Sequence, residues 1–149
     1  MIIRVITSRC TIGDFMKPLL IDEKLLDELS LKANESPRLR MNYNLHRSLD
    51  ERAQKMLNAL QPGTSFPVHR HRHTAETYIV LRGAIKVFLY NDDGSPLSSH
   101  LLDPCEGAYG MEIPAGVFHN LEVIDKNSVI FEAKEGPYIP VSPEDTLFG

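Results

Sequence analysis

The stretch GTSFPVHRHRHTAETYIVLRG, residues 63–83, carries most of the information about the fold. His69 and His71 are two residues apart, and side chains at that spacing share one face of an extended strand. Glu76 is out of phase with both histidines, so it reaches the same point only if the chain turns near residues 72–75. Two imidazoles and a carboxylate that converge in this way indicate a site for a divalent metal ion.

A second stretch, PAGVFH at residues 114–119, supplies a further imidazole. Pro114 and Gly116 predict a tight turn that opens another strand, with His119 near its start and pointing inward. Ligands held by one rigid framework bind an ion tightly, because the entropy of gathering them was lost on folding. We therefore predict four metal ligands from neighbouring strands: His69, His71, Glu76 and His119. His73 is expected on the turn and exposed to solvent.

Beyond Pro37 the apolar pattern has a period of two, which is typical of β-strands. The strand-like segments are short, rich in β-branched or aromatic residues, and separated by turn sequences. This pattern predicts a mainly β protein, a closed or sandwich-like antiparallel structure. The segments are 55–60, 77–81, 84–90, 97–102, 109–113, 118–124 and 128–133.

A helix is predicted before the strands. Asp22 is available as its N-cap, and the chain leaves the helix at Ser36-Pro37. The apolar stripe of this helix consists of Leu25, Leu26, Leu29 and Ala33.

Residues 50–60 fit either a helical stripe or a strand, and we favour a loop or short turn that leads into a strand. The chain then divides into an N-terminal extension (1–15), an N-terminal helical arm (16–40) and a β-barrel domain (41–149).

Composition and charge argue against some classes of binding partner. The 149 residues suit one domain, and 16 basic against 20 acidic residues give a net charge of −4. The basic residues form no run that could neutralise phosphates in a row, which argues against nucleic acid. We find no export leader and no membrane segment, so no membrane partner is expected. Cys10 and Cys105 are too few for a disulfide framework, which favours the cytoplasm.

Residues 63–83 and 114–119 resemble the two sequence motifs of the cupin superfamily. Gly107 stands one residue further from Pro114 than is usual, and Val123 replaces the customary Asn, but neither departure touches a predicted ligand. The phrases SPRLR, NYNLH and EAKEGPY are similar to those of WbuC-type cupin-fold metalloproteins, and the likeness covers about residues 16–145. The resemblance implies a double-stranded β-helix, or jelly-roll barrel, with a short N-terminal helix. It also implies a homodimer, encoded in some relatives near O-antigen or polysaccharide genes.

Three neutral nitrogens and one carboxylate suit one divalent transition metal ion: Fe(II), Mn(II), Ni(II), Co(II) or Zn(II). In six-coordinate geometry two positions stay open for a small-molecule ligand. Residues expected to line the pocket around these positions are Arg38, Arg40, Asn42, Asn44, His46 and Tyr78. The competing interpretation of these arginines and asparagines is that they form turns or carry surface charge. For His46 it is a local hydrogen bond or a place on the surface. Tyr78 also belongs to the aromatic residues expected to fill the barrel, with Phe88, Tyr109 and Phe118.

Two functions of different class stay open. One is a metal-dependent enzyme that acts on a small oxygen-rich, sugar-like or sugar-acid-like substrate in polysaccharide or O-antigen metabolism. The other is a non-catalytic, metal-dependent binding or sensing domain, and a purely structural ion is a third interpretation. Apart from the predicted ligands, no His/Tyr acid–base pair stands out in the sequence. No catalytic residue is therefore assigned from the sequence.

Overall fold

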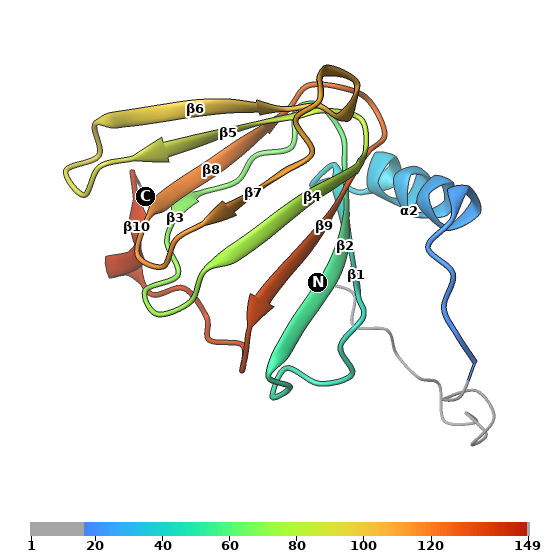
Figure 1. Ribbon diagram of the computed structural model, residues 1–149, viewed down its shortest axis with the longest axis horizontal. Helices are drawn as coiled ribbons and strands as arrows, with labels where there is room; N and C mark the ends of the chain where they lie inside the picture. Colours follow the sequence, from blue (N-terminus) through green and yellow to red (C-terminus); the bar gives the residue numbers. More distant parts are fainter. Residues whose placement is uncertain (1–16, 149) are drawn as a thin grey trace.

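The computed structural model describes residues 17–148 (Figure 1). The predicted N-terminal extension, residues 1–15, lies outside the described residues. Within the described range the chain forms one α-helix, two short 3₁₀ turns and ten strands. The helix is α2 (Glu23–Glu35), and the first five strands are β1 (Arg40–Asn44), β2 (Ala53–Leu60), β3 (Val68–His69), β4 (Glu76–Arg82) and β5 (Ile85–Tyr90). The remaining strands are β6 (Pro96–Leu102), β7 (Gly110–Ile113), β8 (Phe118–Val123), β9 (Ser128–Glu135) and β10 (Thr146–Leu147).

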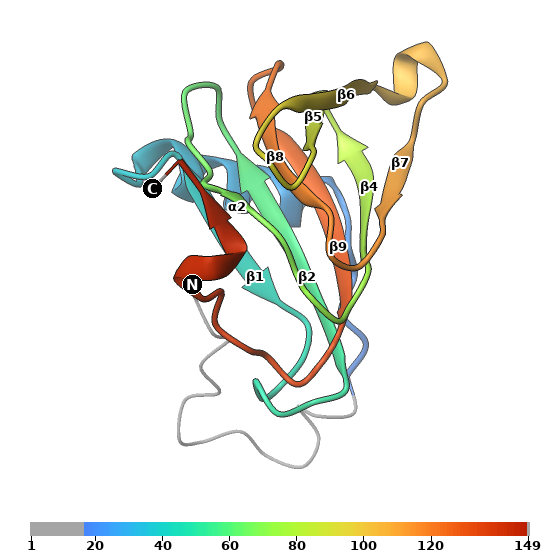
Figure 2. The same cartoon turned by 90° about the vertical axis from the view of Figure 1, so that its left-hand side faces the viewer.

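The strands form two five-stranded sheets, ordered β1-β2-β9-β4-β7 and β10-β3-β8-β5-β6. Every strand pair is antiparallel. Figures 1 and 2 show the sheets facing each other, with α2 on the outer side of the first sheet. In each strand every second side chain points into the space between the two sheets. These side chains together form the interior of the sandwich. The predicted mainly β, jelly-roll architecture is confirmed.

Helix α2 forms where the sequence pattern predicts it. The Asp22 carboxylate accepts a hydrogen bond from the Leu25 backbone N–H at 3.0 Å, which satisfies one of the unpaired donors of the first turn. Leu26, Leu29 and Ala33 are buried. They pack in one cluster with the outward-facing Leu57, Ala59 and Val129 of β2 and β9. The helix therefore covers the outer face of the sheet and leaves the inner face free.

Several parts of the structure differ from the sequence pattern or resolve it. Strand β1 (Arg40–Asn44) was not among the expected strands, because its residues are mostly polar. The ambiguous segment before Leu60 is the strand β2, as favoured. Tyr109 does not fill the barrel: 62% of it is exposed, because it precedes the edge strand β7 instead of facing the interior. Tyr78 and Phe118 are buried, as expected, and Phe88 is half-buried.

The C-terminal segment returns to the strand that carries His69. In register, Thr146 pairs with His69. The Asp145 carboxylate accepts hydrogen bonds from Arg70 Nε at 2.8 Å and from Arg72 at 2.7 Å. The segment thus braces β3 and the turn after it from outside. Among the described residues, no helix has an apolar run long enough to cross a bilayer.

Candidate metal centre and cavity

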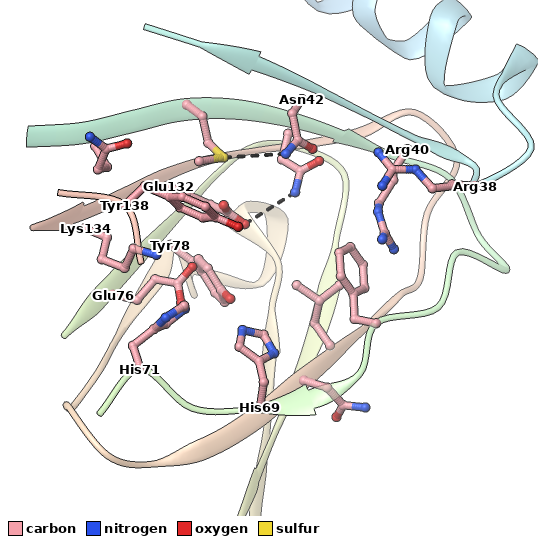
Figure 3. A pocket seen from close by; sticks show the side chains of 16 residues that line it. Arg38, Arg40, Asn42, His69, His71, Glu76, Tyr78, Glu132, Lys134 and Tyr138 are labelled. Carbon is pink, nitrogen blue, oxygen red and sulfur yellow. Dashed lines mark hydrogen bonds and ion pairs between the residues drawn. The ribbon is translucent and has the colours of Figure 1, made fainter. Parts of the chain in front are cut away.

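The structure brings four donor side chains together at one end of the interior. His69 lies on β3, His71 on the turn that follows, Glu76 at the start of β4 and His119 on β8. One donor atom from each lies within 4.8 Å of the other three. His69 and His119 are paired in register across β3 and β8, and the chain bends before Glu76 as its spacing required. Figure 3 shows His69, His71 and Glu76 pointing toward one region.

Backbone carbonyls orient two of the imidazoles. His69 Nδ1 lies 3.0 Å from the Pro67 carbonyl oxygen, and His119 Nδ1 lies 2.9 Å from that of Val117. A carbonyl only accepts hydrogen bonds, so each Nδ1 is the protonated nitrogen and each Nε2 carries a free lone pair. Metal-binding histidines are oriented in the same way in other proteins, with the second ring nitrogen donating to a carbonyl or carboxylate.

The contacts inside the cluster fit an ion better than they fit hydrogen bonds. His71 Nε2 lies 2.9 Å and His119 Nε2 lies 3.3 Å from the same oxygen, Glu76 Oε2. Yet Glu76 Oε2 and His119 Nε2, both buried, have no hydrogen bond of acceptable geometry. Buried polar atoms without a partner are costly, and an ion between them would satisfy both. Three imidazole nitrogens and a carboxylate suit a divalent transition metal.

The local electrostatics favour the protonation states that coordinate a metal. Burial, together with the neighbouring imidazoles, lowers the pKa of His69 to about 4, so this ring is neutral at physiological pH. Burial would raise the pKa of Glu76, but in the metal-free site protons shared with His119 and His71 outweigh burial and hold that pKa well below its usual range. A bound cation would take the place of those protons. Glu76 is therefore ionised. Neutral imidazole and ionised carboxylate are the forms that bind metal.

A cavity of about 330 Å³ opens beside these donors (Figure 3). Of the residues predicted to line it, Arg38, Arg40, Asn42 and Tyr78 do so. Asn44 and His46 do not, because both are enclosed by protein, with 1% and 4% of their surface exposed. His46 Nδ1 instead lies 2.9 Å from the backbone carbonyl oxygen and 3.1 Å from the backbone nitrogen of Lys55, which is the local hydrogen bonding that competed with the pocket interpretation.

Of the other side chains considered from the sequence, His73 lies away from the donors and Tyr78 lies beside them. His73, expected on the turn, is exposed and is not one of the four donor residues. Burial, and then the charges of Glu76 and Glu132, raise the pKa of Tyr78 well above its usual value. Its hydroxyl therefore stays protonated.

Sequence reasoning missed Glu132 and Lys134, two further cavity residues on β9. Their signal was available: they alternate with the buried Ile130, so all three share the inner face of one strand. Asn58 Nδ2 donates to Glu132 Oε1 at 3.4 Å. Burial, and then the charge of Glu76, raise the pKa of Glu132 to about 8. Glu132 is thus a carboxyl group that holds its proton near neutral pH.

Solved structures with a similar fold come from several organisms. CapF, a capsular polysaccharide assembling protein of Staphylococcus aureus, is 19% identical with a TM-score of 0.61; the match covers 93% of this chain and 36% of CapF. KdgF from Halomonas sp. is 15% identical with a TM-score of 0.53, over 67% of this chain and 80% of KdgF. The cupin domain of Schizosaccharomyces pombe Cnp3 is 14% identical with a TM-score of 0.51, over 65% and 60% of the two chains. At these identities the likeness shows the fold, and the fold is that of a cupin.

Within that fold the chain belongs to the family described as domain of unknown function DUF6016, which matches residues 21–102. The matched range runs from just before α2 to the end of β6. It includes three of the four donor residues and stops short of His119. No curated protein matches the sequence at a significant level.

Proposed function

We propose that this protein is a metal-dependent cupin that binds a small oxygen-rich molecule, sugar-like or sugar-acid-like, and acts on it as an enzyme. His69, His71, Glu76 and His119 would hold one divalent transition metal ion. The observation that carries the proposal is the cluster of four donor groups, three of which, His69, His71 and Glu76, line a cavity. A purely structural ion would need no such cavity, whereas a ligand-binding ion needs access for the ligand.

When bound, the ion would supply Lewis-acid polarisation of ligand oxygen atoms. The chain supplies recognition and a proton. The amides of Asn42 and Asn58 line the cavity and offer both donors and acceptors for hydroxyl groups. Glu132 faces the same cavity, and in the metal-free protein it holds its proton near neutral pH, so it is our candidate for proton transfer.

We also propose a subfamily, a metabolic role, a compartment and an oligomeric state for this protein. The phrases around residues 36–46 and 132–138 support a WbuC-type protein. The name of CapF, a capsular polysaccharide assembling protein, supports a role in polysaccharide or O-antigen metabolism. We further propose a cytoplasmic homodimer, on the sequence grounds given above.

A metal-dependent binding or sensing domain is the second candidate. It is favoured by one observation: apart from the donor cluster, no histidine of the described chain lines the cavity to serve as a base. The two candidates differ in whether a bound ligand is converted to product.

The test begins with elemental analysis of protein purified without added metal. Tropolone, a small ligand with two adjacent oxygen atoms, is then titrated into wild type and two variants by calorimetry. We expect His71→Ala to lose metal and tropolone binding, and His73→Ala to keep both, because His73 is exposed two residues further on. Equal binding by the two variants would contradict the proposal. Product formation from candidate sugar acids, followed by NMR and lost in His71→Ala, separates the enzyme from the binding domain.

A further inference from the structure

Arg40 is held in a fixed position at the cavity wall. Its guanidinium lies over the Phe66 ring, 4.5 Å from the ring centroid. It also donates a hydrogen bond to the Ser65 carbonyl oxygen. A guanidinium carries five N–H donors in one plane, so most of them stay available after this contact. The fixed guanidinium borders the cavity, where Figure 3 shows Arg38 beside it.

Neither of these arginines has a carboxylate partner within the described chain. Arg70, Arg72 and Arg82 each form an ion pair with an acidic side chain. No such pair within 4.0 Å includes Arg38 or Arg40. Burial, and then the positive charge of Arg38, lower the pKa of Arg40. Two like charges at one wall without a counter-ion destabilise each other, and an anion between them would offset that cost.

Figure 3 shows the order of groups along the cavity, with Glu76 and His71 at one end and Arg38 and Arg40 at the other. The charges of both Glu76 and Arg40 act on Glu132. The charges of Arg38 and Glu132 act on Arg40. Glu132 therefore lies between the donor cluster and the arginine pair. The donors occupy one end of the cavity, and the arginines occupy the other.

The charges near the cavity are mainly positive, although the whole chain has a net charge of −4. Three basic side chains, Arg38, Arg40 and Lys134, line it, against the carboxyl groups of Glu76 and Glu132. Glu76 belongs to the donor cluster, where a divalent cation would more than neutralise it. Low-dielectric walls concentrate such a field inside a cleft.

We propose that Arg40, together with Arg38, forms an anion subsite and that the ligand of this protein is a small organic anion. The carboxylate or phosphate of the ligand contacts the guanidinium groups, and oxygen atoms at its other end reach the metal donors. Arginine suits this role because its planar fork matches both anions with two parallel hydrogen bonds. A cavity of about 330 Å³ limits the ligand to a small molecule. This inference rests on the proposed function and narrows its ligand class.

The test uses metal-loaded protein and three probes of similar size: D-glucuronate, D-glucose 6-phosphate and neutral D-glucose. Binding is measured by calorimetry in wild type, Arg40→Met and Arg40→Lys. Arg52→Met is the matched control, since Arg52 is exposed and outside the cavity. We expect at least one anion to bind about tenfold more tightly than glucose, as loss of one charge-assisted contact implies. Arg40→Met should remove this preference, Arg40→Lys should keep part of it, and Arg52→Met should leave it unchanged.

The outcomes separate the inference from the function on which it rests. Whichever anion shows the larger preference identifies the ligand group as carboxylate or phosphate. If no anion binds better than glucose, or if the preference survives in Arg40→Met, the anion subsite is refuted, even where tropolone still binds through the metal. If the anions bind metal-free protein as tightly, and Arg40→Met abolishes this, the subsite is real but the metal-dependent function is refuted. Thermal unfolding of each variant, together with Arg40→Lys, keeps the test valid should Arg40→Met fail to fold.

Discussion

The two ends of the interior are made by the same strands but differ in chemistry. At one end the inward side chains of β2, β4, β8 and β9 are Leu60, Val80, Leu121, Val123 and Ile130, which form one buried apolar cluster. At the other end the same strands place Asn58, Glu76, His119 and Glu132 inward. Along each strand the change occurs within two to four residues.

This comparison shows how a small barrel can carry a polar site without losing its core. The apolar end removes aliphatic side chains from water, and each buried one contributes about 1.5–3 kcal/mol. The polar end holds groups whose burial costs free energy unless each has a partner. Stability and chemistry are thus separated along the strands, and substitutions at the two ends should have different consequences.

The largest expected effect is at the polar end. His119→Ala removes one of four donors, and four-ligand sites bind zinc with about 10–16 kcal/mol. A quarter of that free energy, about 2.5–4 kcal/mol, corresponds to a loss of about 70- to 900-fold in metal affinity. Competition with a chelator of known affinity measures the loss. An unchanged affinity would remove His119 from the site.

At the apolar end, Ile130→Ala should lower the free energy of unfolding by about 3 kcal/mol, because it leaves a cavity in the core. Denaturant unfolding of the metal-free protein measures this loss. Metal affinity, measured where the variant is folded, should change little. A large loss of metal affinity in Ile130→Ala would show that the two ends are not independent.

An effect that is smaller when counted per pH unit comes from Glu132. The pKa of Glu132 rises from 4.5 to about 8 on folding, so the folded state prefers the protonated form. Its contribution to stability is complete below pH 4.5 and is lost as the pH rises toward 8, at about 1.4 kcal/mol per pH unit. Glu76, Lys134 and Arg40 are the charged groups that act on it.

Glu132→Gln keeps the shape of the protonated form and cannot ionise. The variant should therefore lack this fall in stability between pH 5 and 8. Unfolding of metal-free wild type and variant, compared at each pH, isolates the contribution of Glu132. Parallel curves for the two proteins would show that Glu132 does not titrate in this range.

The smallest effect concerns the brace on β3. Asp145→Asn weakens the hydrogen bonds to Arg70 and Arg72 and loosens the segment that carries His69 and His71. Metal affinity should fall by less than about tenfold, below the usual range for residues that contact a ligand directly. The chelator assay used for His119→Ala measures it. A loss as large as that of His119→Ala would mean that the C-terminal segment belongs to the site itself.

Much of this structure could be predicted from local sequence signals. The helix α2 could be predicted from its N-cap and its apolar stripe, and most strands from their period of two. Each of these signals depends only on residues that are neighbours in the sequence. The spacing of His69, His71 and Glu76 required a bend before Glu76, and the chain bends there.

The remainder depended on contacts that a pattern cannot reveal. Strand β1 exists because it pairs with β2, although its own residues are mostly polar. Nothing in the sequence around Asp145 indicates that it meets Arg70, 75 residues earlier in the chain. Asn44 shares the spacing of Asn42 yet is enclosed, since tertiary packing decides which side chains reach the cavity. Glu132 was missed because an acidic residue in a strand is more often exposed.

The proposed metal site requires that imidazole nitrogen atoms and a carboxylate oxygen converge on one ion. The direct measurement is an anomalous difference map from crystals of protein purified without added metal, recorded at the absorption edge of the metal that elemental analysis identifies. We predict one peak per chain, about 2.0–2.2 Å from nitrogen atoms of His69, His71 and His119 and from a Glu76 oxygen. A peak elsewhere, or ordered hydrogen bonds among these four side chains with no peak at all, would contradict the account.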